Sequence, residues 1–310
     1  MTARAGAVRK AKLGISPIAW TNDDLPQLGG DTPLSTCLAE SQEAGFLGTE
    51  MGGKFPTTVN ELRPLLARYD LRLVGGWYSG TLLDTELEHE QTRVRAQLAL
   101  FRDCGASVLV YGETAGTIQN RQDVPLARRR RLTDGEVDAY AAKLTRFAEF
   151  CAASGVAFAF HHHMGTAIED ERDIDRLMAR TGRAVGLLFD TGHLAFAGAD
   201  PLRVLEHHGD RVVHVHAKDI RADVLAALDR DRDSFLDAVL KGVFTVPGDG
   251  TLDFGAIAGK LAGAGYDGWF IVEAEQDPVA APPLEYARIG QRALTSVLER
   301  AGYVIESAFV

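Results

Sequence analysis

Eight short runs of mostly apolar residues recur along the chain, and most of them end in polar or ionisable residues. They are residues 13–20, 45–53, 71–79, 107–114, 156–163, 185–193, 212–219 and 269–276. A strand that is buried on both faces is apolar at nearly every position, whereas a half-exposed strand alternates. The runs therefore predict eight strands of a buried sheet.

Segments with a helical pattern separate these runs. They are residues 34–45, 57–69, 85–104, 134–154, 170–181, 200–208, 222–241, 254–264 and 284–301. The helix at 134–154 has a start signal, because Thr133 and Glu136 have the T-x-x-E spacing of a capping box. Strands that alternate with helices indicate a parallel sheet, and eight such units predict an α/β fold of the (β/α)₈ or TIM barrel type.

The chain length fits one barrel domain with elaborated loops. Its 310 residues slightly exceed the roughly 250 that are typical of a TIM barrel. The longest connections are 114–133 and 219–253, and barrels place substrate specificity in such loops. The four arginines at 128–131 are interpreted as a solvated face. We expect a single domain at 13–310 after a flexible extension at 1–12, which lacks the apolar region of a secretory signal.

Composition and charge narrow the class of function. The formal net charge of -10 disfavours nucleic acid and anionic membranes as partners, and favours a small neutral or carbonyl substrate. No apolar run reaches the roughly 18 residues needed to span a bilayer. The three cysteines, Cys37, Cys104 and Cys151, are widely spaced, which argues against a disulfide framework or a thiolate metal site. We therefore expect a cytoplasmic protein.

Ionisable residues gather at the predicted strand ends. Residues at i and i+2 of a strand point to the same face, and three such pairs are His161 with His163, His214 with His216, and Glu273 with Glu275. The carboxyl ends of all strands of a TIM barrel meet at one mouth, where active sites form. Asp190 and His193 add to this group at the end of the sixth strand.

This combination of side chains predicts a metal site. Asp190, His216 and Glu273 are the primary candidate ligands, and His161 is the candidate for a fourth position. Imidazole and carboxylate ligands without thiolate suit Mn²⁺, Co²⁺, Fe²⁺ or Zn²⁺, whereas Mg²⁺ alone more often takes only oxygen ligands. We expect Mn²⁺ or Co²⁺.

Other residues near the strand ends are candidates for substrate contact. Lys218 and Lys54 can bind hydroxyl groups or take part in proton transfer, and His193 can support the metal or contact the substrate. Trp77 and Trp20 can form an apolar wall for a sugar ring, although strand-end aromatics are equally common in cores.

Several motifs resemble those of inosose dehydratases, which are members of the xylose isomerase-like barrel superfamily. They are GISPIAWTNDD, GTEMGGKFP, LVGGWYS, HHHMGT, FDTGH, HVHAKDIR and VPGDGTLDF, and the resemblance covers about residues 13–295. It implies a lyase of inositol catabolism that removes water from 2-keto-myo-inositol (scyllo-inosose) with Mn²⁺ or Co²⁺. It also permits a homo-oligomer.

The resemblance also bears on the metal ligands. It implies that Asp190, His216 and Glu273 fill three metal positions of the superfamily. Many members supply a glutamate from the fifth strand, whereas this chain has His161 at the matching position. His163 and Glu169 are the alternatives for the fourth ligand.

Dehydration of a polyhydroxy ketone needs a base and an acid. The base removes the proton from the carbon next to the carbonyl, and the acid protonates the hydroxyl that leaves from the carbon beyond it. The candidates are His193, Lys218, His163 and Glu113, with His193 preferred for proton transfer. The sequence leaves acid and base unassigned among them.

Three other functions compete with dehydration. A ketose isomerase or epimerase uses the same kind of metal site without loss of water. Metal-assisted cleavage of DNA, as in apurinic endonucleases of this barrel type, is disfavoured by the acidic balance. A catalytically silent sugar-binding barrel is disfavoured by the many ionisable residues at the mouth.

Overall fold

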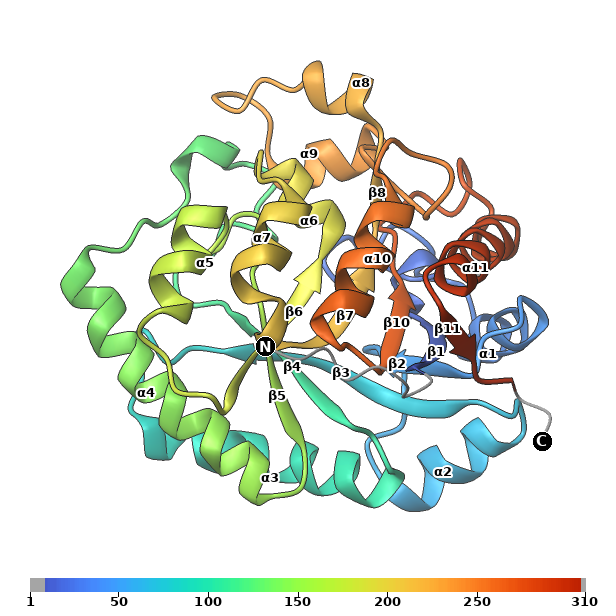
Figure 1. Cartoon of the computed structure of the whole chain (residues 1–310), viewed down its shortest axis with the longest axis horizontal. Coiled ribbons are helices and arrows are strands. Elements are labelled where there is room, and N and C mark those ends of the chain that lie inside the picture. The colour runs from blue at the N-terminus through green and yellow to red at the C-terminus, as the bar shows by residue number, and fades with distance from the viewer. Residues whose placement is uncertain (1–8, 308–310) are drawn as a thin grey trace.

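A closed barrel of eight parallel strands forms the centre of the computed structural model, which describes residues 9–307 (Figure 1). The strands are β1 (Arg9–Ile15), β2 (Gly48–Met51), β3 (Arg72–Gly80), β4 (Val108–Glu113), β5 (Ala157–His161), β6 (Val185–Asp190), β7 (Val212–Ala217) and β10 (Trp269–Val272). Each pairs in parallel with its neighbours, and pairing of β10 with β1 closes the barrel. The predicted (β/α)₈ fold is confirmed.

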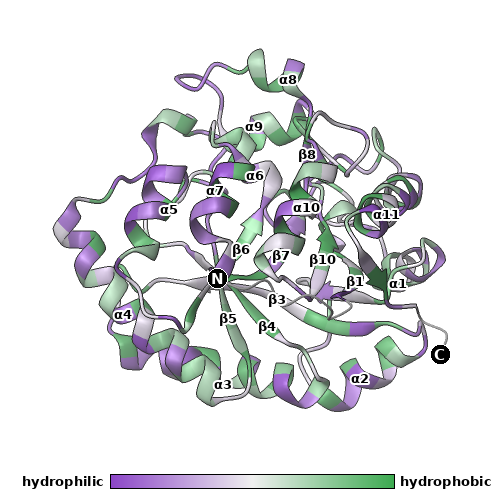
Figure 2. Cartoon of the chain, viewed as in Figure 1, coloured by the Kyte–Doolittle hydropathy of each residue, from purple (hydrophilic) through white to green (hydrophobic). Residues whose placement is uncertain are grey.

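A ring of helices surrounds the strands (Figure 1). These helices are α1 (Leu34–Glu43), α2 (Val59–Ala67), α3 (Leu87–Cys104), α4 (Asp134–Ala153), α5 (Glu171–Met178), α7 (Pro201–His208), α10 (Phe254–Ala264) and α11 (Pro283–Arg300). Figure 2 shows hydrophobic residues along the strands and a mixture of hydrophobic and hydrophilic residues on the helices. At the start of α4, Thr133 and Glu136 make both bonds of the predicted capping box.

Several smaller elements decorate the barrel. They are α6 (Thr191–Phe196), α8 (Ala222–Ala226), α9 (Phe235–Leu240), the antiparallel pair β8 (Asp219–Ile220) and β9 (Phe244–Thr245), and the 3₁₀ turns η1 (Pro17–Ala19), η2 (Leu126–Arg128) and η3 (Gly209–Arg211). None of the helices within residues 9–307 combines the length and apolarity that a bilayer crossing requires.

The predicted helix at 222–241 is wrong, because two short helices, α8 and α9, replace it. The acidic side chains between them bond to nearby backbone N–H groups: Asp233 accepts from the amide of Asp229, and Asp229 accepts from the amide of Asp231. Such local bonds compete with helix formation. Ser234 then starts α9 with a new capping box.

The barrel begins earlier than the sequence indicated. Residues 9–11 of β1 pair with a short outer strand, β11 (Tyr303–Ile305), and Ala11 is buried. Lys12 is in register with Trp269 of β10. Residues 9–12 therefore belong to the barrel and not to a flexible extension, and the rest of the expected extension, residues 1–8, lies outside the described part of the chain.

The strand register brings polar residues together at the carboxyl ends. Asp190, the last residue of β6, is directly opposite His216 of β7. Asp190 also caps α6, because its Oδ1 accepts from the backbone amide of His193 at 2.8 Å. The sharp change from strand to helix after Asp190 keeps the start of α6 at the same end of the barrel.

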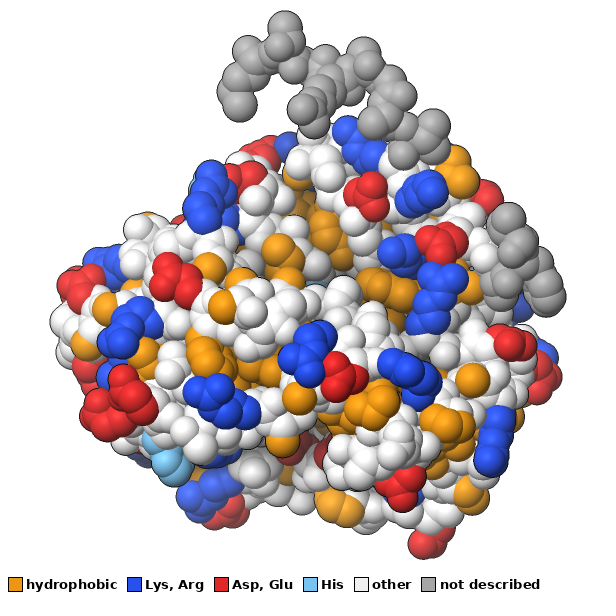
Figure 3. Space-filling model, turned by 90° about the horizontal axis from the view of Figure 1, so that it is seen from below, with side chains coloured by type: hydrophobic (Ala, Val, Ile, Leu, Met, Phe, Trp, Pro, Cys, Tyr) orange, Lys and Arg blue, Asp and Glu red, His pale blue; other side chains and the backbone are white. Residues whose placement is uncertain are grey.

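The surface does not form a large basic face in the view of Figure 3. Lys and Arg side chains are interspersed there with Asp and Glu side chains. This mixture offers no extended basic stripe for a phosphate backbone on that face.

Candidate active site

A cavity of about 480 Å³ opens at the carboxyl ends of the strands. Its lining includes Glu50, Trp77, His161, His163, His216, Glu273 and Glu275, together with Asp23, Asp24 and Gln119 from loops. Pockets for small ligands typically range from about 300 to 1,000 Å³. The cavity therefore has the size for a small ring, and its lining is rich in groups that bind hydroxyls.

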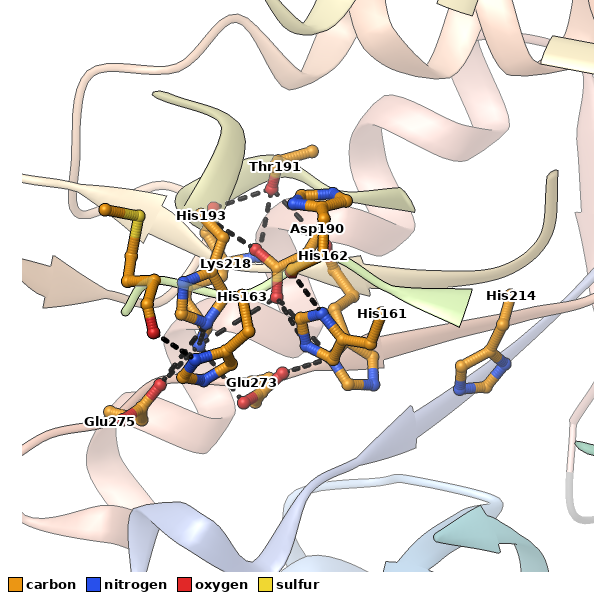
Figure 4. A network of polar contacts seen from close by, with 12 residues as sticks. His161, His162, His163, Asp190, Thr191, His193, His214, Lys218, Glu273 and Glu275 are labelled. Carbon is orange, nitrogen blue, oxygen red and sulfur yellow. Dashed lines mark hydrogen bonds and ion pairs between the residues drawn. The ribbon is translucent and has the colours of Figure 1, made fainter. Parts of the chain in front are cut away.

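Three side chains of the cavity lining form a compact buried group with Asp190, which lies beneath them. His161, Asp190, His216 and Glu273 each offer one ligand atom, and these atoms lie within 4.8 Å of one another. The Oδ2 of Asp190 is 3.7 Å from Nε2 of His161 and 3.5 Å from Nδ1 of His216. Figure 4 shows His161, Asp190 and Glu273 converging on one point. These are the four residues that the sequence indicated as ligands.

The inner atoms of these side chains face one another, and Nδ1 of His216 is in close contact with Oε2 of Glu273. Asp190 Oδ2, His216 Nδ1 and Glu273 Oε2 are buried and lack a hydrogen bond to any residue in the range 9–307. Two carboxylates and two imidazoles held this closely together, without a full set of hydrogen bonds, are costly unless a cation lies between them. His161 donates from Nδ1 to the carbonyl of His162 at 2.5 Å, which leaves a lone pair on Nε2 facing Asp190. The four side chains therefore fit a divalent cation.

Glu50, near the end of β2, holds one member of this group in place through a hydrogen bond. Its Oε1 accepts from Nε2 of His216 at 3.1 Å and from Nε2 of His214 at 2.8 Å. Burial opposes ionisation of Glu50, but the two imidazoles outweigh it and hold the pKa of this carboxyl below its usual range. A carboxylate that orients a ligating histidine is a common feature of metal sites. Glu50 is not among the site residues predicted from the sequence.

Lys218 lies fully buried beside the four-residue group. Its Nζ is 2.8 Å from Glu275 Oε1, 3.1 Å from Glu273 Oε1 and 3.0 Å from His193 Nε2. Burial alone lowers the pKa of Lys218, but the carboxylates of Glu273 and Glu275 outweigh burial and raise it. The side chain is therefore an ammonium ion, and its three N–H groups face three acceptors.

The two histidines near Lys218 differ in their access to the cavity. His163 lines the cavity and donates from Nδ1 to the carbonyl of Met164 at 2.9 Å, which leaves its Nε2 available as an acceptor. His193 is fully buried, and its Nε2 accepts from Lys218. Among the residues that the structure describes, the cavity lining includes His163 but neither His193 nor Lys218.

Comparisons with known proteins place the chain in a family. A family model described as the xylose isomerase-like TIM barrel matches residues 38–297. An inosose dehydratase of Geobacillus thermodenitrificans (strain NG80-2) is 43% identical over 280 residues, which cover 90% of this chain and 94% of the relative. The chain belongs to the inosose dehydratase family. The resemblance inferred from the motifs is thereby confirmed.

Two further comparisons frame this family membership. The rhizopine catabolism protein MocC of Rhizobium meliloti is 49% identical over 297 residues, which cover 96% of this chain and 91% of that protein. A solved structure of an IolI protein with a bound zinc atom has a TM-score of 0.65 at 15% identity, and covers 94% of this chain and 99% of that one. Because the identity is only 15%, this comparison shows that the two proteins share a fold and nothing more.

The two tryptophans have different surroundings in this family member. Trp77 lines the cavity, and its ring centroid is 5.7 Å from that of His161 and 5.8 Å from that of His163. A Cβ at Gly112 would lie 2.0 Å from the indole of Trp77, so this glycine leaves room for the ring. Trp20 is 1% exposed in the core and donates from Nε1 to Glu40, so the structure does not place it in a substrate wall.

Two other candidates also lie away from the cavity lining within residues 9–307. Lys54 is directed to the loop after η1, where its Nζ donates to the carbonyls of Gly30 and Thr32 at 2.7 Å. Glu113 accepts from the amide of Ala115 at 3.0 Å and from the hydroxyl of Tyr111 at 2.9 Å. Burial raises the pKa of Glu113 to about 7. Both side chains thus have internal partners in place of a substrate.

Glu169 also has a partner other than the metal group. Arg129 is buried and lies 3.4 Å from Glu169, 2.8 Å from Asp170 and 2.8 Å from Asp173. The interpretation of the whole arginine run as a solvated face is therefore wrong for Arg129, which neutralises buried carboxylates. The Oε2 of Glu169 accepts from the amide of Gly165 at 2.8 Å, and Glu169 is absent from the group formed by His161, Asp190, His216 and Glu273.

Proposed function

We propose that this protein is an inosose dehydratase, a hydro-lyase that removes one water from 2-keto-myo-inositol to give a deoxy diketone in inositol catabolism. The observation that carries the proposal is the group of four buried ligand atoms beside a cavity of about 480 Å³. The inosose dehydratase of Geobacillus thermodenitrificans, 43% identical to this chain, supports the choice of substrate.

The metal in this proposal is Mn²⁺ or Co²⁺, held by His161, Asp190, His216 and Glu273. Two imidazoles and two carboxylates favour a transition metal over Mg²⁺, which prefers an all-oxygen shell. When bound, such a cation acts as a Lewis acid on the substrate carbonyl. Glu50 supports the proposal because it fixes His216 with Nδ1 turned toward Asp190 and Glu273.

We assign proton abstraction to His163. Its Nδ1 is bonded to the carbonyl of Met164, so the free lone pair is on Nε2 and the ring lines the cavity. This position meets the first requirement of a general base, which is reach to the substrate proton. His193, the residue favoured by the sequence, and Lys218 act in this proposal as positioning residues behind the cavity.

We assign protonation of the departing hydroxyl to Asp24, which is not among the residues predicted from the sequence. Asp24 lines the cavity from the loop after η1. Burial raises the pKa of its carboxyl, while nearby His163 opposes this effect. A carboxyl group with a raised pKa retains its proton at higher pH, as a general acid requires.

We also place the reaction in the cytoplasm. Cys37, Cys104 and Cys151 are free thiols in the structure, which supports a reducing compartment.

A substrate panel tests the proposed function. The protein is stripped of metal, resupplied with Mn²⁺ or Co²⁺, and incubated with 2-keto-myo-inositol and with several ketoses, and the products are weighed by mass spectrometry. The proposal expects loss of one water from 2-keto-myo-inositol only. A product of unchanged mass with altered stereochemistry or carbonyl position would instead show an isomerase or epimerase.

A further inference from the structure

The Nζ of Lys218 contacts two members of a second group of potential metal ligands, His193 at 3.0 Å and Glu275 at 2.8 Å. His163, His193 and Glu275 offer ligand atoms that lie within 4.8 Å of one another, and all three residues are buried. Figure 4 shows Lys218 among these side chains, next to Glu273. The group resembles the first one in chemistry, since both combine two imidazoles with carboxylate, yet an ammonium already occupies it.

We propose that the ammonium of Lys218 fills a second cation position and thereby limits the centre to one divalent ion per chain. This inference rests on the metal centre of the proposed function. It assigns to Lys218 a positioning role in place of proton transfer.

The contacts of Lys218 are those of a fixed internal cation. Its three N–H groups are matched by Glu275, Glu273 and His193 at 2.8, 3.1 and 3.0 Å. These are hydrogen-bond distances, and they are longer than the roughly 2.0–2.2 Å of a metal–ligand bond. An ammonium has three donors and no acceptor, so Lys218 has none left for a substrate.

The surroundings of the side chain are shaped for it. A Cβ at Gly192 would lie 2.5 Å from Cγ of Lys218, so only glycine leaves room for the aliphatic stem at that position. On the far side, Nζ lies 4.7 Å from the ring centroid of Phe244, where a cation is favoured.

The negative charges nearest Nζ are matched by one metal ion and one lysine. Three buried carboxylates lie within 3.9 Å of Nζ, namely Asp190, Glu273 and Glu275. One divalent cation neutralises two of them, and Lys218 neutralises the third. A buried carboxylate without such compensation is strongly destabilising. Loss of the lysine charge therefore leaves one buried carboxylate without a counter-charge, and a second divalent ion can bind there to neutralise it.

The test counts metal ions in Lys218→Ala. Metal-free wild type and variant are dialysed against Co²⁺, and bound cobalt per chain is measured by elemental analysis. We expect one ion in the wild type and two in Lys218→Ala, with the electron paramagnetic resonance signal of the variant changed by coupling between neighbouring ions. The surface variant Lys260→Ala, which removes only an exposed ion pair with Glu206, is expected to bind one.

A double variant checks where the second ion binds. Lys218→Ala with Glu275→Gln is expected to return to one ion, because Glu275 belongs to the second group and not to the first. If Lys218→Ala does not fold, Lys218→Ser is measured in its place, since serine is also short enough to leave space for an ion.

The outcomes separate this inference from the proposed metal centre. One ion in both the wild type and a folded Lys218→Ala or Lys218→Ser would overturn the role of Lys218 and leave the metal centre intact. Two ions in the wild type would also overturn it. A wild type that binds no Co²⁺ at all would overturn the metal centre and the inference together.

Discussion

Glu50 Oε1 accepts a hydrogen bond from Nε2 of His216 at 3.1 Å. This imidazole therefore carries a proton on Nε2, and Nδ1, which faces Asp190 Oδ2 at 3.5 Å and Glu273 Oε2, is the ring atom left to bind a cation. The same Glu50 oxygen accepts from His214, so one carboxylate fixes both histidines of β7. The orientation of His216 toward the cation site thus depends on a residue of the second strand.

Replacement of Glu50 by glutamine should weaken metal binding without removing a ligand. Loss of the negative charge makes Nδ1 of His216 less basic and therefore a weaker metal ligand. Changes of this kind typically cost about 10- to 100-fold in metal affinity. Isothermal titration of metal-free Glu50→Gln with Mn²⁺ measures the effect. The exposed carboxylate of Glu206 provides the control Glu206→Gln, and equal affinities for both variants would contradict the role of Glu50.

Replacement of His163 by glutamine should slow turnover while the metal remains bound. Loss of a general base typically costs about 10²- to 10⁴-fold in kcat, and His163 is absent from the four-residue metal group. Steady-state kinetics combined with a metal assay tests this expectation. Near-normal turnover of His163→Gln together with a severe loss in His193→Ala would move proton transfer to His193.

The two tryptophans provide a matched pair. Trp77→Ala removes part of the cavity wall and should raise KM about 10-fold or more through lost contact with the substrate ring, with a small effect on folding. Trp20→Ala empties a core position and should cost about 3–5 kcal/mol of stability with KM unchanged. Kinetics and chemical denaturation of both variants distinguish the roles, and the reverse pattern would contradict them.

The strand ends were largely predictable from the sequence, because the i, i+2 rule and the barrel geometry need only local patterns. His161 with His163 and Glu273 with Glu275 do line one cavity, and the alternation of runs gave the correct fold. The residues that pair with buried charged side chains were not predictable from such local patterns. Glu50 meets His216 across the barrel, and the sequence separation of 166 residues leaves no local signal.

Surface and interior were also hard to distinguish for long side chains. Lys54 follows one predicted strand and Lys218 lies near the end of another, yet Lys54 is exposed and bonds to loop carbonyls whereas Lys218 is buried among carboxylates. Trp20 and Trp77 also both lie near predicted strand ends, yet Trp20 is buried in the core and Trp77 lines the cavity. The difference depends on the neighbouring loops and on space left by Gly192 and Gly112, which a pattern of hydrophobic positions does not encode.

Stability should fall with rising pH through the titration of Glu113. Burial raises the pKa of this carboxyl from 4.5 to about 7 in the folded protein. Between these values the unfolded chain releases its proton while the folded chain retains it, so ionisation favours unfolding as pH rises and the effect is complete above about pH 7.

The variant Glu113→Gln removes this titration. It should be more stable than the wild type by about 1–3 kcal/mol at pH 8 and close to the wild type at pH 4.5, and urea denaturation at the two pH values measures both. The exposed variant Glu136→Asp keeps a carboxylate at the α4 capping box and serves as a control for general pH effects. An equal stability difference at both pH values would contradict a titrating Glu113.

The coupling of water loss to one bound ion tests the central claim most directly. Metal-free protein is titrated with Mn²⁺ in the presence of 2-keto-myo-inositol, and bound metal and dehydrated product are measured in the same samples. We expect the rate of water loss to rise in proportion to bound Mn²⁺ and to level off at one ion per chain, with Asp190→Asn inactive at the same Mn²⁺ concentrations. Full dehydration by the metal-free protein, or by Asp190→Asn without bound metal, would contradict the account.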